Sequence, residues 1–114
     1  MGDCIFCSIA DKSIQSKIVY EDEYVLAFDD ISPQAPVHVI IIPKKHIFSV
    51  DSLSEDNREM IVALNLSFKK IAQIKNIDKT GYRIVSNHLS TAGQSVFHLH
   101  FHLLGGRSMN WPPG

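Results

Sequence analysis

The sequence alternates histidine with apolar residues in the stretch His98-Leu99-His100-Phe101-His102-Leu103-Leu104. Side chains two residues apart on an extended strand point to the same face, so this stretch predicts a strand with three imidazoles on one face and apolar groups on the other. A solvated strand face needs no cluster of groups that titrate near neutrality, which favours a functional face. A zinc site on the strand is the main alternative, because neutral imidazole is a common zinc ligand.

Small and polar residues flank this stretch. Upstream, Thr91-Ala92-Gly93-Gln94-Ser95 predicts a loop whose backbone can approach an anion closely and aim successive N–H groups at it. Downstream, Gly105-Gly106 is expected to end the strand. We therefore expect the histidines to lie beside an anion site.

Composition limits the classes of protein and ligand. With 114 residues, 45% hydrophobic and 20% charged, the chain is expected to form one domain over residues 1–114. Its formal net charge of −1 offers no basic surface for a nucleic-acid polymer, so a small phosphate ester is the better ligand. There is no apolar run long enough to span a bilayer, and Met1-Gly2-Asp3-Cys4 lacks the layout of a secretory signal. We expect no membrane partner and a cytoplasmic location, with the nucleus as a further compartment.

Apolar periodicity predicts a short helix, three strands, a long helix and two more strands. The expected ranges are 4–12 for the short helix and 18–20, 25–28, 37–42, 82–86 and 98–104 for the strands. Ser52-Leu53-Ser54-Glu55 has the form of a capping box that opens the long helix. This order indicates an α+β fold with an antiparallel sheet covered on one face.

The chain has two cysteines, in the motif Cys4-Ile5-Phe6-Cys7. Their spacing is too tight for an ordinary structural disulfide, which leaves a redox pair, half of a zinc site or two free buried thiols. A redox motif of the thioredoxin type would follow a strand, and none is expected before Cys4. Metal binding is therefore favoured over redox chemistry.

Several motifs together resemble one family. The stretch from Gly93 to Arg107 and the tail Trp111-Pro112-Pro113-Gly114 resemble the signature and C-terminus of the histidine triad (HIT) family, and within it the Hint branch of purine nucleoside phosphoramidases. Residues 26–36 and 42–46 also match that branch, and the match runs from Ile5 to Gly114. The resemblance implies the HIT-like α+β fold, with a five-stranded antiparallel sheet per subunit, one short N-terminal helix and one long central helix. It also implies a homodimer that joins two sheets, which agrees with an apolar arm at Trp111; packing of this arm on its own domain is the alternative.

The resemblance assigns the reaction to the last strand and the loop before it. His100 is the implied nucleophile, since an imidazole with a free lone pair can form a nucleotidyl-histidine that water then hydrolyses. His102 is implied to contact the phosphate. The other implied phosphate contacts are Asn87, Gly93, Gln94, Ser95 and Val96. Ser95 is also expected to help protonate the departing amine, its alternative being a loop hydroxyl bonded to backbone.

The nucleoside end of the implied substrate needs a ribose clamp and an apolar slot. Asp30 matches the residue that accepts hydrogen bonds from both ribose hydroxyls. Phe6, Ile9, Phe28 and Ile31 match positions that line the base pocket, although each fits a core position equally well.

His98 has two implied duties. In the family it supports the catalytic site, and in members with an N-terminal C-x-x-C it resembles the fourth ligand of a structural zinc held by Cys4, Cys7, His46 and His98. Such a closed site stabilises the fold, and no cofactor is required for catalysis. A zinc held by all three triad histidines would consume the lone pair that the nucleophile needs.

The chain departs from the Hint pattern at Asp29, where a histidine is familiar, and in residues 87–92, which replace a more glycine-rich acidic loop. His38 and His88 receive no role and are expected to be a packed and an exposed histidine. The predicted function is hydrolysis of the P–N bond in purine nucleoside 5′-phosphoramidates or aminoacyl adenylates. The alternatives are a nucleotide-binding regulator or scaffold with little turnover, and a dinucleoside polyphosphate hydrolase, against which the Trp-Pro-Pro-Gly tail argues.

Overall fold

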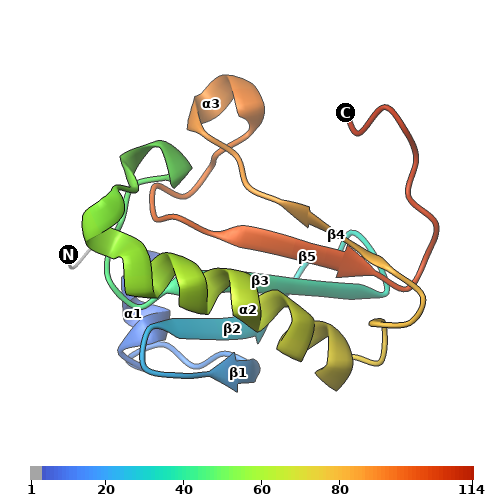
Figure 1. Cartoon of the computed structure of the whole chain (residues 1–114), viewed down its shortest axis with the longest axis horizontal. Coiled ribbons are helices and arrows are strands. Elements are labelled where there is room, and N and C mark those ends of the chain that lie inside the picture. The colour runs from blue at the N-terminus through green and yellow to red at the C-terminus, as the bar shows by residue number, and fades with distance from the viewer. Residues whose placement is uncertain (1–3) are drawn as a thin grey trace.

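The computed structural model describes residues 4–114 and is built around one sheet (Figure 1). Its strands are β1 (Ile18–Glu21), β2 (Val25–Asp29), β3 (Val37–Pro43), β4 (Tyr82–Val85) and β5 (Phe101–Gly105). Its helices are α1 (Ile5–Ala10), α2 (Arg58–Ile74) and α3 (Leu89–Ala92), with short 3-10 turns η1 (Val50–Ser52) and η2 (Glu55–Asn57). The strands lie in the order β1-β2-β3-β5-β4, and every neighbouring pair is antiparallel. The predicted α+β class and antiparallel sheet are confirmed.

The long helix α2 packs across one face of the sheet, as Figure 1 shows. Strand alternation sends every second residue of β2, β3 and β5 toward this helix. Its core joins the sheet residues Val25, Ala27, Val39, Ile41 and Leu103 to the α2 residues Met60, Leu64, Ile71 and Ala72. The apolar residues whose periodicity predicts the long helix therefore form the main core together with the sheet.

A second, smaller core lies on the opposite face. Phe6 and Ile9 of α1 pack there against Leu26, Phe28, Ile40 and Ile42, which are the alternate residues of β2 and β3. The expectation that only one face is covered is thus wrong, because α1 covers part of the second. Since β3 is buried on both faces, its apolar run is almost continuous.

The strand that carries the histidines is shorter than predicted. β5 begins at Phe101, so His98 and His100 precede it. Its partner β3 ends at Pro43, which has no N–H to extend the ladder. Upstream of Phe101 the chain bonds elsewhere: the Leu99 N–H donates to the Ile47 carbonyl, and the Ser86 hydroxyl donates to the His100 carbonyl.

Two other local predictions are corrected. The capping box lies at Ser54 and Asn57 and opens η2, whereas Ser52 belongs to η1, so the predicted box between Ser52 and Glu55 is wrong. The loop expected at 91–95 begins inside α3, a single turn that ends at Gly93 with φ of +103°. Glycine adopts that backbone conformation without a steric penalty.

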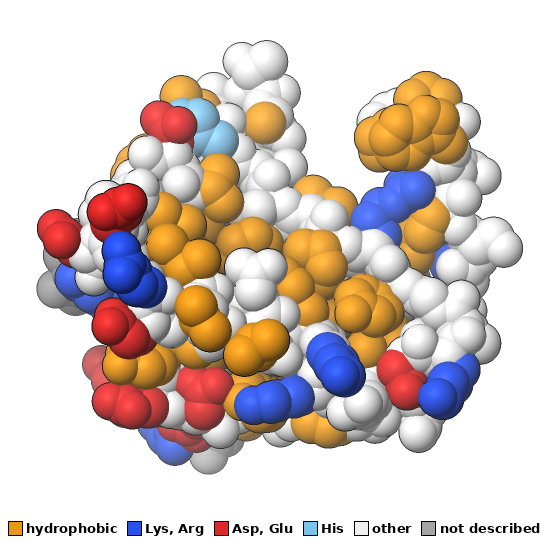
Figure 2. Space-filling view, in the orientation of Figure 1, with side chains coloured by type: hydrophobic (Ala, Val, Ile, Leu, Met, Phe, Trp, Pro, Cys, Tyr) orange, Lys and Arg blue, Asp and Glu red, His pale blue; other side chains and the backbone are white. Residues whose placement is uncertain are grey.

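The C-terminal segment stands away from the rest of the molecule, at the upper right of Figure 2. Trp111 is 81% exposed, and a guanidinium N–H of Arg83 donates to the Asn110 carbonyl at 3.0 Å. Packing of Trp111 into its own domain is therefore not what the structure shows. No helix within residues 4–114 has both the length and the apolarity to cross a bilayer. Residues 1–3, on which the secretory-signal prediction partly depends, lie outside the described part of the chain.

Candidate functional site

A cavity of about 820 Å³ opens on the sheet face opposite α2. This volume is typical of small-molecule sites. The predicted site residues that line it are Phe6, Ile9, Phe28, Asp30, Ile31, Ser95, Val96, His100 and His102. The structure therefore brings together, in one cavity, residues from α1, from β2 and the turn after it, and from β5 and the segment that leads into it.

One part of the cavity wall is apolar. The rings of Phe6 and Phe28 meet edge to face, with centroids 5.7 Å apart, and Ile9 is buried beside them. Ile31, by contrast, is 98% exposed and contributes to the wall from outside the core. These groups form a slot that suits a flat aromatic ligand.

His100 is a buried polar group of the cavity wall, held by a hydrogen bond to the backbone. It is 6% exposed, and its Nδ1 lies 2.7 Å from the carbonyl oxygen of His98. A carbonyl only accepts, so Nδ1 carries the proton and donates it. In the neutral ring Nε2 then has a free lone pair, which is the form that a nucleophile requires.

His102 lies next to His100, with ring centroids 5.2 Å apart. Burial, followed by the nearby His100 and His38 rings, lowers the pKa of His102 to about 4, with Asp30 acting in the opposite direction. His102 is therefore uncharged near neutral pH. As a neutral ring it can donate one hydrogen bond and accept one.

His38 is a site residue that the sequence analysis missed. Its Nε2 lies 2.9 Å from His102 Nδ1 and 3.4 Å from Asp30 Oδ2. Burial lowers its pKa, with Asp30 opposing that effect. The signal that could have identified it is strand alternation: His38 lies two residues from Ile40, which pairs with His102.

The loop before β5 holds its predicted residues in different ways. Ser95 lines the cavity, but Asn87, Gly93 and Gln94 are not among the lining residues. Gln94 is buried, accepts from the Leu89 N–H and donates to the carbonyls of Phe48 and Val96. Its side chain thus holds the loop together, and any contact with a ligand would come from its backbone.

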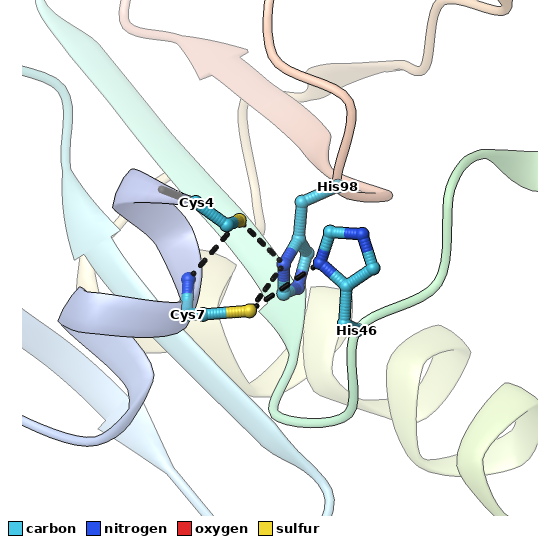
Figure 3. A group of neighbouring side chains, drawn as sticks. All are labelled: Cys4, Cys7, His46 and His98. Carbon is cyan, nitrogen blue, oxygen red and sulfur yellow. Dashed lines mark hydrogen bonds between the residues drawn. The ribbon is translucent and has the colours of Figure 1, made fainter. Parts of the chain in front are cut away.

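A second cluster lies behind the cavity, where α1 meets the loops after β3 and before β5 (Figure 3). Cys4 Sγ is 3.3 Å from His98 Nδ1, and Cys7 Sγ is 3.3 Å from His46 Nδ1 and 3.6 Å from His98 Nδ1. All four candidate ligand atoms lie within 4.8 Å of one another. Ligand atoms around a tetrahedral zinc are about 3.3–3.8 Å apart, given Zn–N and Zn–S bonds of about 2.0–2.3 Å. The cluster could therefore bind a metal ion, and its donor set is compatible with zinc.

The protonation states in this cluster also suit a cation. His98 Nε2 lies 2.9 Å from the Pro43 carbonyl and donates to it, so Nδ1 keeps its lone pair on the side of the cysteines. Burial lowers the pKa of His98, which keeps the ring neutral. Burial and the neighbouring Cys4 raise the pKa of the Cys7 thiol. A bound cation would offset this effect by stabilising the thiolate.

The structure separates His98 from the other two histidines of the motif. His98 is fully buried and does not line the cavity. The ring of Phe6 packs between the two sites: its centroid lies 5.0 Å from that of His100 and 5.9 Å from that of His98. The side chain of His98 thus contacts the cysteine cluster, and only its carbonyl serves the cavity, through His100.

His88 bonds outside the cavity. Its Nδ1 lies 2.7 Å from the Ser49 hydroxyl, and its Nε2 is 3.8 Å from Asp51 Oδ2. The expected exposed histidine is therefore only partly exposed, and its ring ties the loop before α3 to the segment after β3.

Comparison with known proteins identifies the family. The family model described as HIT domain matches residues 11–109. An uncharacterized HIT-like protein of Synechococcus elongatus is 46% identical over 112 residues, which cover 98% of this chain and 97% of that protein. A solved HIT family hydrolase from Legionella pneumophila is 48% identical with a TM-score of 0.95, covering 98% of this chain and all of the other (100%). A histidine triad protein from Clostridium difficile is 42% identical with a TM-score of 0.92, covering 96% of each chain. With its antiparallel sheet, its paired cavity histidines and these matches, the chain belongs to the HIT domain family and has the HIT-like α+β fold.

Proposed function

We propose that this protein is a nucleotide-binding hydrolase of the Hint type, which cleaves the P–N bond of purine nucleoside 5′-phosphoramidates through a nucleotidyl-His100 intermediate. One observation carries the proposal: the His98 carbonyl holds the proton on His100 Nδ1, so Nε2 offers a lone pair in a cavity with an apolar slot. Relatives described as HIT family hydrolases, from Legionella pneumophila and Clostridium thermocellum, support hydrolysis as the reaction class.

The first step forms a bond between His100 Nε2 and phosphorus and breaks the P–N bond. The electron pair of the broken bond goes to nitrogen, which takes a proton and leaves as the amine. Ser95 lines the cavity and is the proposed proton donor. In the second step water attacks phosphorus and gives one proton back to Ser95. The P–His100 bond breaks, its electron pair returns to His100 Nε2, and the nucleoside monophosphate leaves.

Binding of the nucleoside is proposed to use the other cavity residues. The Asp30 carboxylate would accept from the ribose hydroxyls, and the base would lie in the slot of Phe6, Ile9, Phe28 and Ile31. His102, neutral and adjacent to His100, would donate to a non-bridging phosphate oxygen as charge develops there.

Turnover of two nucleotide classes tests this proposal. We expect the protein to release AMP from adenosine 5′-phosphoramidate and to act far more slowly on a dinucleoside polyphosphate. His100→Ala should abolish the release, whereas His88→Ala, outside the cavity, should retain it. Tight AMP binding without release of AMP from the phosphoramidate would instead favour the regulator or scaffold, a role that the 81% exposed Trp111 would also suit.

We also propose that the cluster of Cys4, Cys7, His46 and His98 holds a structural zinc. Its four protein ligands leave no open coordination position, so the ion would fasten α1 to the sheet without entering the reaction. Metal analysis of untagged protein, purified without chelator, should find about one zinc per chain. Cys4→Ser and Cys7→Ser together should remove it, and a zinc-free wild type would contradict the proposal.

A homodimer completes the proposal. β4 is an edge strand of the sheet, and the C-terminal segment with the exposed Trp111 is tied to it through Arg83 and Asn110. An exposed strand edge and an exposed aromatic arm on the same side suit pairing with a second copy. The cytoplasmic location remains a prediction from the sequence.

A further inference from the structure

The cavity holds two neighbouring histidines whose rings have different neighbours behind them. We infer that His38 is a positioning residue that fixes the tautomer of His102, so that His102 presents Nε2–H to the phosphate while His100 presents a lone pair. The catalytic consequence of this inference rests on the proposed function, but the tautomer itself does not. Two contacts determine the assignment, and a third modulates it.

The first contact fixes His38. The backbone N–H of Gln34 donates to His38 Nδ1 at 3.0 Å. A backbone N–H can only donate, so this Nδ1 is an acceptor and carries no proton. The ring is 6% exposed, and its lowered pKa keeps it neutral. The one ring proton of His38 is therefore on Nε2.

The second contact passes this constraint to His102. His38 Nε2–H lies 2.9 Å from His102 Nδ1, so it donates and His102 Nδ1 accepts. The reverse direction would leave His38 without a proton on either nitrogen, as an imidazolate. A doubly protonated His102 would place two N–H groups against each other at this distance. A neutral His102 must therefore carry its proton on Nε2.

The third contact, with Asp30 on the substrate side, acts on the same His38 proton. Asp30 Oδ2 lies 3.4 Å from the same Nε2–H, while Asp30 Oδ1 accepts from the Ser32 N–H at 2.7 Å. In the free protein the carboxylate thus competes weakly with His102 for the His38 proton. Ribose hydroxyls that donate to Asp30 would reduce this competition. Sugar binding would then favour the His38–His102 hydrogen bond.

His100 and His102 therefore present different groups to the cavity, although both are histidines. The His98 carbonyl accepts a hydrogen bond from His100 Nδ1–H, so His100 has a lone pair at Nε2. The His38 Nε2–H donates a hydrogen bond to His102 Nδ1, so His102 carries its proton at Nε2. Within residues 4–114 no hydrogen-bond partner is found for His102 Nε2, and the ring lines the cavity. This N–H is therefore available to a phosphate oxygen, where one donor is worth about 100-fold or more in rate.

Nitrogen NMR of the ligand-free protein labelled at histidine tests the tautomers directly. Long-range proton–nitrogen correlations should show His100 protonated at Nδ1 and His102 protonated at Nε2. His38→Met removes the donor at similar side-chain length, so His102 should become a mixture of tautomers while His100 is unchanged. His38→Gln supplies an amide donor at similar reach and should restore the Nε2–H form.

Kinetics separate this inference from the proposed function. With adenosine 5′-phosphoramidate, His38→Met should lower kcat by about 10- to 100-fold with little change in KM, and His38→Gln should recover most of it. Wild-type His102 protonated at Nδ1, or an unchanged His102 tautomer in His38→Met, would overturn the inference even if turnover is normal. The predicted tautomers in a protein that never releases AMP would instead contradict the proposed function alone. The wild-type spectrum decides the tautomer even if a variant fails to fold.

Discussion

At the scale of residues, the chemistry of each cavity histidine depends on the atom behind its ring. A carbonyl backs His100 and an N–H backs His102, although the two lie in the same sequence motif. The sequence could predict that both rings lie on one face, because the facing of a side chain on a strand depends only on the two-residue alternation. It could not assign their tautomers, since these depend on Gln34, His38 and the His98 carbonyl, which only the folded chain brings into contact.

The partly buried ring of His102 predicts an acid-sensitive stability. Its pKa is about 4 in the folded protein against an ordinary 6.5, so between these values the unfolded chain binds more protons than the folded one. The free energy of unfolding should therefore fall as the pH drops from 6.5 to 4. His102→Gln should reduce that fall by about 1–2 kcal/mol, a value discounted because the ring is partly exposed. Urea unfolding of both proteins across this range measures it, and parallel curves would contradict the assignment.

Gln94 predicts a second effect at this scale. Removing its side chain leaves the Leu89 N–H and the Phe48 carbonyl without their partners. Gln94→Ala should therefore lower the free energy of unfolding by roughly 2–4 kcal/mol. Gln73→Ala, on the exposed side of α2, is the matched control and should change it by less than about 0.5 kcal/mol. Denaturant unfolding distinguishes the two, and equal effects would show that the hydrogen bonds of Gln94 contribute little.

At the scale of elements, α1 depends on contacts beyond its own sequence. It has six residues, too few to form a stable helix alone in water. Phe6 and Ile9 pack on the sheet, and Cys4 and Cys7 meet His46 and His98. The helix that provides Phe6 and Ile9 of the apolar slot is thus held at the cluster of Cys4, Cys7, His46 and His98.

Metal removal should therefore loosen α1 and weaken nucleotide binding together. With the proposed zinc bound, a strong chelator should speed hydrogen exchange in α1 and lower the unfolding free energy by about 3 kcal/mol or more. Nucleotide affinity should fall at least about tenfold, because Phe6 and Ile9 line the cavity. Ser8→Ala, on the same helix but outside the cluster, serves as the control and should keep its metal. Fast exchange in α2 but not in α1 would contradict this account.

Most elements could be predicted from the sequence, and the errors have physical causes. β2, β3 and α2 follow from apolar periodicity, since their own side chains form the core. The start of β5 could not be predicted, because it depends on Pro43 ending the partner strand and on Leu99 bonding to Ile47. The cavity residues Phe6 and Ile31 came from family resemblance, since local sequence does not distinguish a buried ring from one that lines a cavity.

At the scale of the whole molecule, the C-terminal segment extends away from the domain. Figure 2 shows an open gap between its apolar group and the projection at the top of the molecule, and Trp111 is 81% exposed. An exposed aromatic group of this size suits burial against a second chain. The proposed homodimer would supply that surface.

Light scattering with size-exclusion chromatography tests this arrangement. We expect a mass near twice 12.8 kDa for the wild type. Trp111→Ala should weaken the dimer by about 10- to 100-fold in dissociation constant, because buried aromatic anchors carry much of an interface's energy. Phe97→Ala removes an exposed aromatic ring elsewhere and is the control. A monomeric wild type at micromolar concentration would contradict the dimer.

The most direct test of the whole account is intact-protein mass spectrometry of the enzyme quenched in alkali during turnover of adenosine 5′-phosphoramidate. If His100 is the nucleophile, an adenylyl group should be found on His100 by peptide analysis and be absent from His100→Ala, with His102 unmodified. Rapid AMP release with no adduct at any quench time, or an adduct on another residue, would contradict His100 as the nucleophile.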